Sequence, residues 1–385
     1  MRNSGADRAR DDPTALALSI ADDIRARGPI SFRDFMERAL YEPGRGYYAR
    51  LQTPWSETAD FVTAPQVDAS FGTAVARLAR ECDAALGAPQ RFDLVEQGGG
   101  DGALIGDVCD ALARDADELY RRIRVWCIER GAAARTRQQE RLAQHADRVR
   151  WLDGLAEIPI GKLEGLLFSN ELLDAFPVHR VVRRDGRLRE LFVDVRGDEL
   201  VEREMEPSTH ELADYLHSNG IDLGEGQVAE ICLAVAPWVA GVAQRLRRGF
   251  LLTVDYGAET SALYGPGRPG GTLVCQHRYQ LNDQPYARIG EQDLTAHVDF
   301  GNLRRSGEEH GLRDAGTCSL AVFLLGFGAG EAIAMDHGGG GGDPDSIRRR
   351  LGLRHLLFTE IGDAHRVMLQ YKDAAPIAFG LERLG

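Results

Sequence analysis

From Phe92 onward, short apolar runs alternate with segments of helical spacing, and this alternation constrains the fold more than any other feature of the chain. The apolar runs predict five strands, with the sequences FDLVEQG, RIRVWCIE, VRWLD, GLLFSNE and GFLLTVDYG. Runs that are apolar throughout are typical of parallel strands covered on both faces. The sequence therefore predicts an α/β fold with a doubly wound, Rossmann-like sheet.

Segments outside this alternation predict additions to the core. Helical spacing over Ala15 to Gly28 and Ile30 to Tyr41 predicts an N-terminal pair of helices, with Ser31 as a cap. Alternating residues around Asp185-Gly186 predict an inserted antiparallel hairpin. A helix is expected over residues 227–248. Near the C-terminus, the segments GLRDAGTCS and RVMLQY predict an antiparallel pair of strands at the sheet edge, with a flexible tract at 338–342 between them.

The chain has 385 residues, which is long for one compact domain, so we expect a main domain with large additions. The expected parts are a disordered tail (1–14), an N-terminal helical and lid segment (15–90), the first part of the main domain (91–177), an inserted hairpin and helix (178–226), and the remainder of the main domain with helical additions (227–385).

Composition and charge narrow the classes of partner. A net charge of −13 repels a phosphate backbone, so nucleic acid is not an expected partner. No apolar run approaches the roughly 20 residues of a membrane span, so no membrane is expected either. The six cysteines stand singly, which is typical of reduced thiols, and the first residues contain no apolar signal region. These features together predict a cytoplasmic protein.

A glycine loop lies between the first predicted strand and the helix behind it. Gly98, Gly100 and Gly102 would allow backbone amides and a helix N-terminus to approach a ligand closely. Read as Gly98-x-Gly100-x-x-Ala103, the same letters also satisfy a dinucleotide fingerprint. The loop by itself leaves the cofactor open.

Three acidic residues stand at the ends of the first three predicted strands. Glu96 precedes the glycine loop, Glu129 ends the second strand, and Asp153 ends the third. The carboxyl ends of parallel strands meet at one edge of a sheet, where a cofactor ribose would lie. A solvated strand end is the alternative for Glu129 and Asp153.

The fourth predicted strand is followed by Asn170, Glu171 and Asp174, which place an amide and two carboxylates at the same edge. Such a group can bind a cation or a hydrogen-bonding nucleophile. The alternative is a helix start capped by Asn170. Further along, His297 and Asp299 form a His-x-Asp pair without a third metal ligand nearby, so we expect a structural histidine and no metal site.

Several motifs, in order, carry a resemblance to a known family. They are Tyr41-x-Pro43-x-x-Gly46-Tyr47-Tyr48, Asp60-Phe61-Val62-Thr63-Ala64-Pro65, Glu96 with the glycine loop, Asn170-Glu171 with Asp174-Ala175-Phe176-Pro177, Asp255-Tyr256-Gly257, Gly271-Thr272-Leu273, and the segment from Asp293 to Phe300. Nearly the whole chain thereby resembles the MidA-type methyltransferases, a family that includes a mitochondrial complex I assembly factor that methylates a protein arginine.

The resemblance implies a class I methyltransferase fold that uses S-adenosylmethionine as its cofactor, with a protein, through an arginine side chain, as the acceptor. It implies that the glycine loop binds S-adenosylmethionine and that Glu129 holds its ribose. Asn170-Glu171 would form the catalytic edge, which the segments of Tyr47 and Phe61 would cover. Two other functions fit the residues: an inert assembly factor that binds the cofactor, and a nucleotide-dependent oxidoreductase.

The chain departs from the family pattern at several positions, among them the tract of residues 274–280. Where the family loop usually runs Gly-Pro-Gly-Arg-Gly or similar, Gly99 and Asp101 stand here, and Gln66 replaces a glutamate. Asp101 would place negative charge near the carboxylate of the cofactor.

Overall fold

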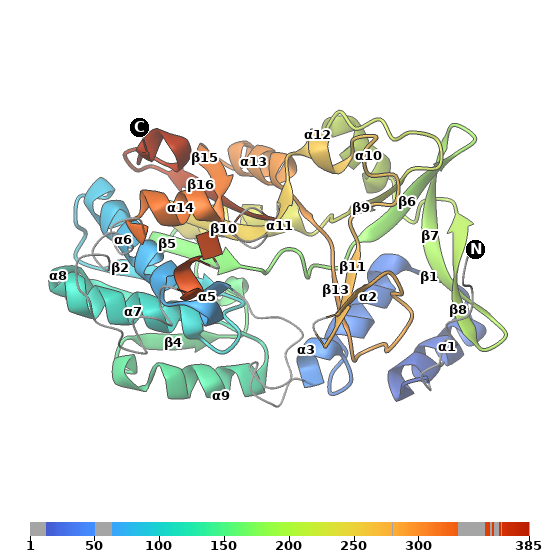
Figure 1. Ribbon diagram of the computed structural model, residues 1–385, viewed down its shortest axis with the longest axis horizontal. Helices are drawn as coiled ribbons and strands as arrows, with labels where there is room; N and C mark the ends of the chain where they lie inside the picture. Colours follow the sequence, from blue (N-terminus) through green and yellow to red (C-terminus); the bar gives the residue numbers. More distant parts are fainter. Residues whose placement is uncertain are drawn as a thin grey trace.

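The computed structural model describes residues 13–50, 64–278, 280–329, 351–354, 356–357, 362 and 364–384. These residues form two lobes, each arranged around its own β-sheet (Figure 1). Phe61, the tract 338–342 and residues 1–12 of the expected tail lie outside the described residues. Within the described part of the chain, no helix is long and apolar enough to cross a membrane.

The larger sheet has the strand order β15-β16-β10-β5-β2-β3-β4. Its strands are β2 (Phe92–Gln97), β3 (Ile123–Ile128), β4 (Val149–Leu152), β5 (Leu163–Asn170), β10 (Leu246–Ala258), β15 (Arg313–Ser319) and β16 (His365–Lys372). The five strands from β4 to β10 are parallel to one another. Strand β16 pairs antiparallel with β10, and β15 pairs antiparallel with β16. The five predicted parallel strands and the late antiparallel pair at the edge are therefore confirmed.

Helices cover both faces of this sheet, as the continuous apolar runs require. Neighbouring strand residues such as Leu166 and Leu167 belong to two different apolar clusters, one on each face. The helices α6 (Ser70–Ala85), α7 (Ala103–Asp115) and α14 (Leu320–Gly326) contribute to the first cluster, and α11 (Val235–Arg245) and α13 (Phe300–Glu309) to the second. The doubly wound α/β class is confirmed.

The smaller lobe contains the antiparallel insertion. Its sheet has the order β1-β7-β6-β9, and β8 pairs with β7. Its strands are β1 (Ile30–Ser31), β6 (His179–Arg184), β7 (Arg187–Arg196), β8 (Glu199–Met205) and β9 (Val228–Ile231), and α10 (Glu211–Ser218) packs nearby. The predicted hairpin is present: Arg184 pairs with Arg187 across Asp185-Gly186, both of which have positive φ.

One predicted helix is wrong at both ends. The helix expected over 227–248 begins only at Val235, because Val228–Ile231 forms strand β9 against β6, and it ends at Arg245 before β10. Pairing with a distant strand here overrides the local helical pattern. The second N-terminal helix begins at Phe32, directly behind its expected cap Ser31, which accepts a hydrogen bond from the Asp34 amide; Ile30–Ser31 also pairs with β7.

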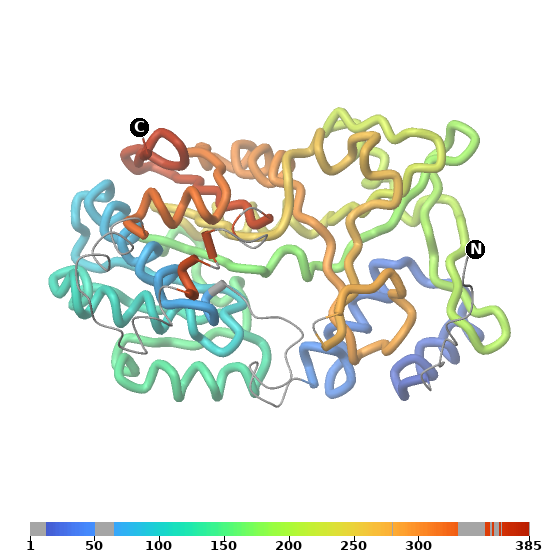
Figure 2. The backbone as a smooth tube through the Cα atoms, viewed as in Figure 1, coloured from blue at the N-terminus to red at the C-terminus, as the bar shows by residue number. Residues whose placement is uncertain are grey.

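The N-terminal helices α1 (Ala15–Arg27) and α2 (Phe32–Tyr41) pack in the smaller lobe with the short helix α3 (Tyr47–Arg50), in one apolar cluster with residues of β7 and β13 (Asp293–Thr295). Figure 2 shows how the chain passes from the larger lobe to the smaller one after β5, and later crosses between the lobes again. Residues 171–178, which follow β5, therefore connect the larger lobe to the smaller one.

Candidate active site

The glycine loop follows β2 and leads into α7. Gly98, Gly100 and Gly102 all have positive φ, at 75°, 54° and 83°. A Cβ atom at Gly98 would lie 2.8 Å from Cδ1 of Leu172, so a larger residue there would be crowded as well as strained. The loop therefore lies against the segment that follows β5, and it ends at the N-terminus of a helix of 13 residues.

The departures from the family pattern form contacts of their own. The Gln66 amide donates to Oδ2 of Asp101 at 3.2 Å, and the Ala103 amide donates to Oδ1 of Asp101 at 3.0 Å. Asp101 therefore bonds to the first residue of α7, whose N-cap is Gly102. A Cβ atom at Gly99 would lie 2.2 Å from Oε2 of Glu96, so Gly99 leaves space for that carboxyl group.

Gln138 of α9 (Ala132–Arg141) supports the loop, and the sequence did not single it out. Its side-chain amide donates to the Gly100 carbonyl at 3.1 Å, and its Oε1 accepts from the Trp151 indole at 3.0 Å. The residue is 1% exposed. One buried amide thus joins the glycine loop, α9 and β4.

The three strand-end acids differ in their surroundings. Glu96 is buried; burial first, and then the charges of Asp101 and Glu129, raise its pKa to about 8. Burial also raises the pKa of Glu129, which accepts a hydrogen bond from the Gly131 amide at 2.7 Å. The side chain of Asp153 is 81% exposed and pairs with Arg135 at 2.6 Å. Glu96 and Glu129 therefore lie beside the loop, whereas Asp153 faces solvent.

The segment after β5 does not start a helix, so the alternative of a helix capped by Asn170 is wrong. Instead, Glu171 adopts a positive φ of 49° and its amide donates to the Val254 carbonyl. This backbone conformation is strained for a residue with a side chain, and strain of this kind is concentrated at functional sites. Asn170 donates from Nδ2 to Oε1 of Glu171 at 3.3 Å, and its Oδ1 is buried without a partner among the described residues.

Carboxyl groups gather at this edge of the sheet. Glu171 and Asp174 follow β5, Asp255 lies in β10 directly after its last pairing with β5, and Asp293 comes from β13 of the smaller lobe. Burial, and after it the three neighbouring negative charges, raise the pKa of Asp174 well above its usual range. Burial also raises the pKa of Asp255 to about 7, against the lowering effect of its hydrogen bond from the Leu173 amide. Because these groups resist ionising together, a cation bound among them would be stabilised.

His365 also lies at this edge, although the sequence analysis did not predict it. Its Nε2 lies 3.1 Å from Oε1 of Glu171, and its ring lies against that of Tyr256, with 3.9 Å between centroids. Glu171 and His365 are 194 positions apart and meet only because β16 pairs with β10. No local pattern could have revealed this contact.

Two tyrosines join the smaller lobe to the acidic edge. The Tyr41 hydroxyl donates to the Ala175 carbonyl at 2.8 Å, and the Tyr48 hydroxyl donates to the Asp293 carboxylate at 3.0 Å. The two rings stack, with 5.5 Å between centroids. Tyr47 is buried in the apolar cluster of this lobe.

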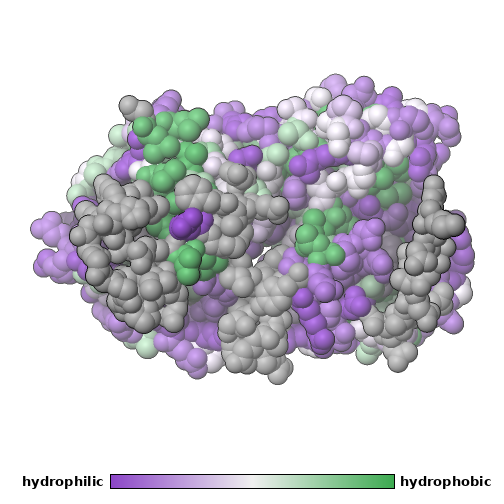
Figure 3. All heavy atoms as spheres, in the orientation of Figure 1, coloured by the Kyte–Doolittle hydropathy of each residue, from purple (hydrophilic) through white to green (hydrophobic). Residues whose placement is uncertain are grey.

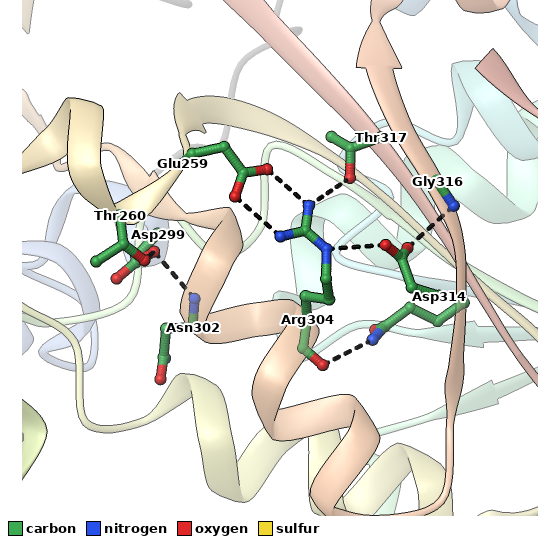
Figure 4. A network of polar contacts seen from close by, with 9 residues as sticks. Glu259, Thr260, Asp299, Asn302, Arg304, Asp314, Gly316 and Thr317 are labelled. Carbon is green, nitrogen blue, oxygen red and sulfur yellow. Dashed lines mark hydrogen bonds and ion pairs between the residues drawn. The ribbon is translucent and has the colours of Figure 1, made fainter. Parts of the chain in front are cut away.

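The His-x-Asp pair has a structural environment. Asp299 caps α13 by accepting from the Asn302 amide at 3.0 Å and also accepts from the Thr260 hydroxyl at 2.6 Å, as Figure 4 shows. In the same view, Arg304 holds α13 to Asp314 of β15. Burial, with the charge of Arg268, lowers the pKa of His297 to about 4. Among the residues that the structure describes, no group of three side chains could hold a metal.

A family model and a solved structure each match more than half of this chain. The model of a family described as "Putative S-adenosyl-L-methionine-dependent methyltransferase" matches residues 74–318, well over half of the chain. A crystal structure of a protein from Burkholderia thailandensis, bound to S-adenosyl-homocysteine, is 30% identical and has a TM-score of 0.83. That match covers 96% of this chain and 94% of the other.

Curated relatives are similar over most of the chain. The mitochondrial protein arginine methyltransferase NDUFAF7 of Mus musculus is 26% identical, over 87% of this chain and 79% of its own. Its homolog in Drosophila melanogaster is 27% identical, over 80% of this chain and 74% of its own. These relatives are mitochondrial proteins, which corrects the cytoplasmic location predicted from the sequence. Single cysteines indicate the redox state of a compartment and do not distinguish between reducing compartments.

The glycine loop alone fitted a dinucleotide as well as S-adenosylmethionine, whereas the family match and the solved relative both select the latter. The interpretation as an oxidoreductase is therefore set aside, and the class I fold and its cofactor are established together. With a doubly wound sheet, a glycine loop at the end of β2 and this set of relatives, the chain belongs to the family of S-adenosylmethionine-dependent methyltransferases.

Proposed function

We propose that this protein methylates an arginine side chain of another protein. The observation that carries the proposal is the gathering of Glu171, Asp174, Asp255 and Asp293 at one edge, where burial raises the pKa values of Asp174 and Asp255. A guanidinium ion is planar, permanently charged and able to form paired hydrogen bonds with a carboxylate. The names of the curated relatives, which are protein arginine methyltransferases, support the same acceptor.

The cofactor would bind at the glycine loop. Gly98, Gly100 and Gly102 would let the backbone approach it, Glu129 would hold its ribose, and Asp153 would lie at the outer rim. Glu96 fits a cationic group of the cofactor, because its Oε2 is buried with no hydrogen-bond partner among the described residues. The glycine backbone and this partnerless acceptor suit the cofactor that the family uses.

Three residues would carry out the transfer. When bound, S-adenosylmethionine supplies an activated methyl group, whose bond to sulfur breaks as its bond to a guanidinium nitrogen forms, and the nitrogen gives up one proton. Glu171 would hold the guanidinium and aim that nitrogen. The partnerless Oδ1 of Asn170 would accept one guanidinium N–H, and Asp174 would stabilise the positive charge from the other side. The released proton would pass to the carboxylate edge.

The proposal is tested with isotope-labelled S-adenosylmethionine and a lysate of the source cells, followed by mass spectrometry of the labelled proteins. We expect the label on arginine. Methyl groups on another kind of residue would contradict the arginine assignment. Cofactor binding without any transfer would instead favour an assembly factor without turnover.

Glu171→Gln then tests the catalytic edge, because it removes the charge and keeps the shape. Single-turnover methylation should fall at least about 100-fold, since contacts at the reacting group act mainly in the transition state. The dissociation constant for S-adenosylhomocysteine should change less than about threefold.

Glu190→Gln is the matched control for this variant. Glu190 is buried and, like Glu171, bonded to a histidine, His179, at 2.7 Å, but it lies in the sheet of the smaller lobe. Normal turnover in Glu171→Gln would refute the catalytic role, and equal losses in both variants would indicate a general effect on folding.

A further inference from the structure

His365 occupies an unusual position for a histidine, at the start of an interior strand and 0% exposed. In the register of β16 and β10 it lies opposite Tyr256, and the two rings are in contact. Its Nε2 faces Oε1 of Glu171 at 3.1 Å. Tyr256 thus fixes the plane of the imidazole ring, and the ring directs one nitrogen at the carboxylate.

Glu171 needs such support, because no regular element holds it. It follows the last residue of β5, no helix begins after it, and its φ is 49°. The other contact to its carboxylate, from Nδ2 of Asn170, is long at 3.3 Å. A side chain in a strained loop is held in one orientation only if neighbouring groups hydrogen-bond to it.

We propose that His365 is a positioning residue for methyl transfer, which donates from Nε2 to Oε1 of Glu171 and so aims the remaining carboxylate oxygen at the acceptor. This inference rests on the proposed function. His365 itself does not touch the acceptor, because Glu171 lies between them.

Two substitutions separate the hydrogen bond from the packing. His365→Phe keeps an aromatic ring against Tyr256 and removes the donor. His365→Gln restores an N–H donor without the ring. If the hydrogen bond matters, single-turnover methylation falls about 10- to 100-fold in His365→Phe and recovers by most of that factor in His365→Gln. The dissociation constant for S-adenosylhomocysteine stays within about threefold of the wild-type value in both.

The matched control is His179→Phe, which removes the histidine of the other buried histidine–glutamate pair. It should lower the midpoint of thermal unfolding without slowing the single turnover. If His365→Phe and His365→Gln slow the reaction equally, or only in proportion to lost folded protein, the positioning role is wrong.

Coupling to Glu171 distinguishes this inference from the proposed function. In the background of Glu171→Gln, adding His365→Phe should slow the reaction less than about threefold further, because residues that act as a unit are not additive. Full additivity would overturn the inference. If Glu171→Gln is itself fully active, the proposed catalytic edge fails instead.

Nuclear magnetic resonance tests the hydrogen bond between His365 and Glu171 without measuring turnover. The Nε2 proton of His365 should be protected from solvent exchange and should shift on Glu171→Gln, but not on Glu190→Gln. A resonance that does not respond to Glu171→Gln would show that the hydrogen bond is not formed in solution and would overturn the inference.

Discussion

The stability that Glu96 contributes changes with pH in the opposite direction to that of an ordinary surface acid. Burial raises its pKa to about 8, so the folded protein retains the proton at a pH where the unfolded chain, with a value near 4.5, has lost it. Its contribution to stability is therefore complete below about pH 4.5 and is lost as the pH rises towards 8.

Glu96→Gln removes this titration. We expect the free energy of unfolding of the wild type to decline relative to that of the variant between pH 5 and pH 8, measured by urea denaturation at each unit. Glu190→Gln is the control for direction, because the carboxyl pKa of Glu190 is lowered and its contribution to stability is lost as the pH falls rather than as it rises. Parallel curves for the wild type and Glu96→Gln would show that Glu96 is ionised in the folded protein throughout this range.

Gln66 donates a hydrogen bond to Asp101 beside the glycine loop. Asp101 accepts a hydrogen bond from the first amide of α7, and a glutamate at position 66, which the family pattern contains, would face it with a second negative charge. Gln66 and Asp101 each depart from the family pattern, but in the structure they complement each other. The amide of Gln66 can donate to the carboxylate of Asp101.

At the scale of elements, Gln138 of α9 connects this helix and β4 to the glycine loop. Gln138→Met keeps the length and removes both hydrogen bonds, which leaves the Gly100 carbonyl and the Trp151 indole without this partner. Losing two buried hydrogen bonds costs about 1–3 kcal/mol, and the part that acts on the loop should weaken S-adenosylhomocysteine binding about 10-fold.

Titration calorimetry on Gln138→Met measures this effect. Gln144→Met is its control, since Gln144 is exposed and bonds to Asp110 away from the loop. Unchanged affinity in folded Gln138→Met would mean that the loop keeps its conformation without α9.

At the scale of the whole molecule, Tyr41 fastens the smaller lobe to the larger one, because its hydroxyl donates to the Ala175 carbonyl in the segment after β5. Its ring stacks on that of Tyr48, whose hydroxyl bonds to Asp293 of β13 within the smaller lobe. The space-filling view in Figure 3 shows the two lobes side by side, with much of the smaller lobe's visible surface hydrophilic. The Tyr48 hydroxyl is therefore expected to hold the stacked pair in place.

Tyr48→Phe removes the hydroxyl that bonds to Asp293 and keeps the ring. Amide hydrogen exchange across residues 41–50 should become about 5- to 100-fold faster, which corresponds to a loss of about 1–3 kcal/mol of local stability. Tyr120→Phe is the control, because the hydroxyl of Tyr120 bonds to His145 within the larger lobe. Unaltered exchange at 41–50 in Tyr48→Phe would show that stacking alone fastens the segment.

Features that depend on a few adjacent residues could be predicted from the sequence. Apolar runs identified the parallel strands, the three glycines identified the loop, and Asp185-Gly186 identified the hairpin, because burial on both faces and positive φ each limit the residues at a few adjacent positions. The order of motifs went further and identified the family. Asn170, Glu171 and Asp174 were singled out from their place after a strand; their catalytic role stays a prediction.

Contacts between distant segments were decided only by the tertiary structure. The pairing of β16 with β10 brings His365 to Glu171, and the folding of α9 against the loop brings Gln138 to Gly100. Strand β9 formed where a helix was predicted, because β6 offered its backbone a partner. A hydrogen bond or strand pairing between remote residues leaves no period or spacing in the chain, so its energy enters only when the fold brings the two partners together.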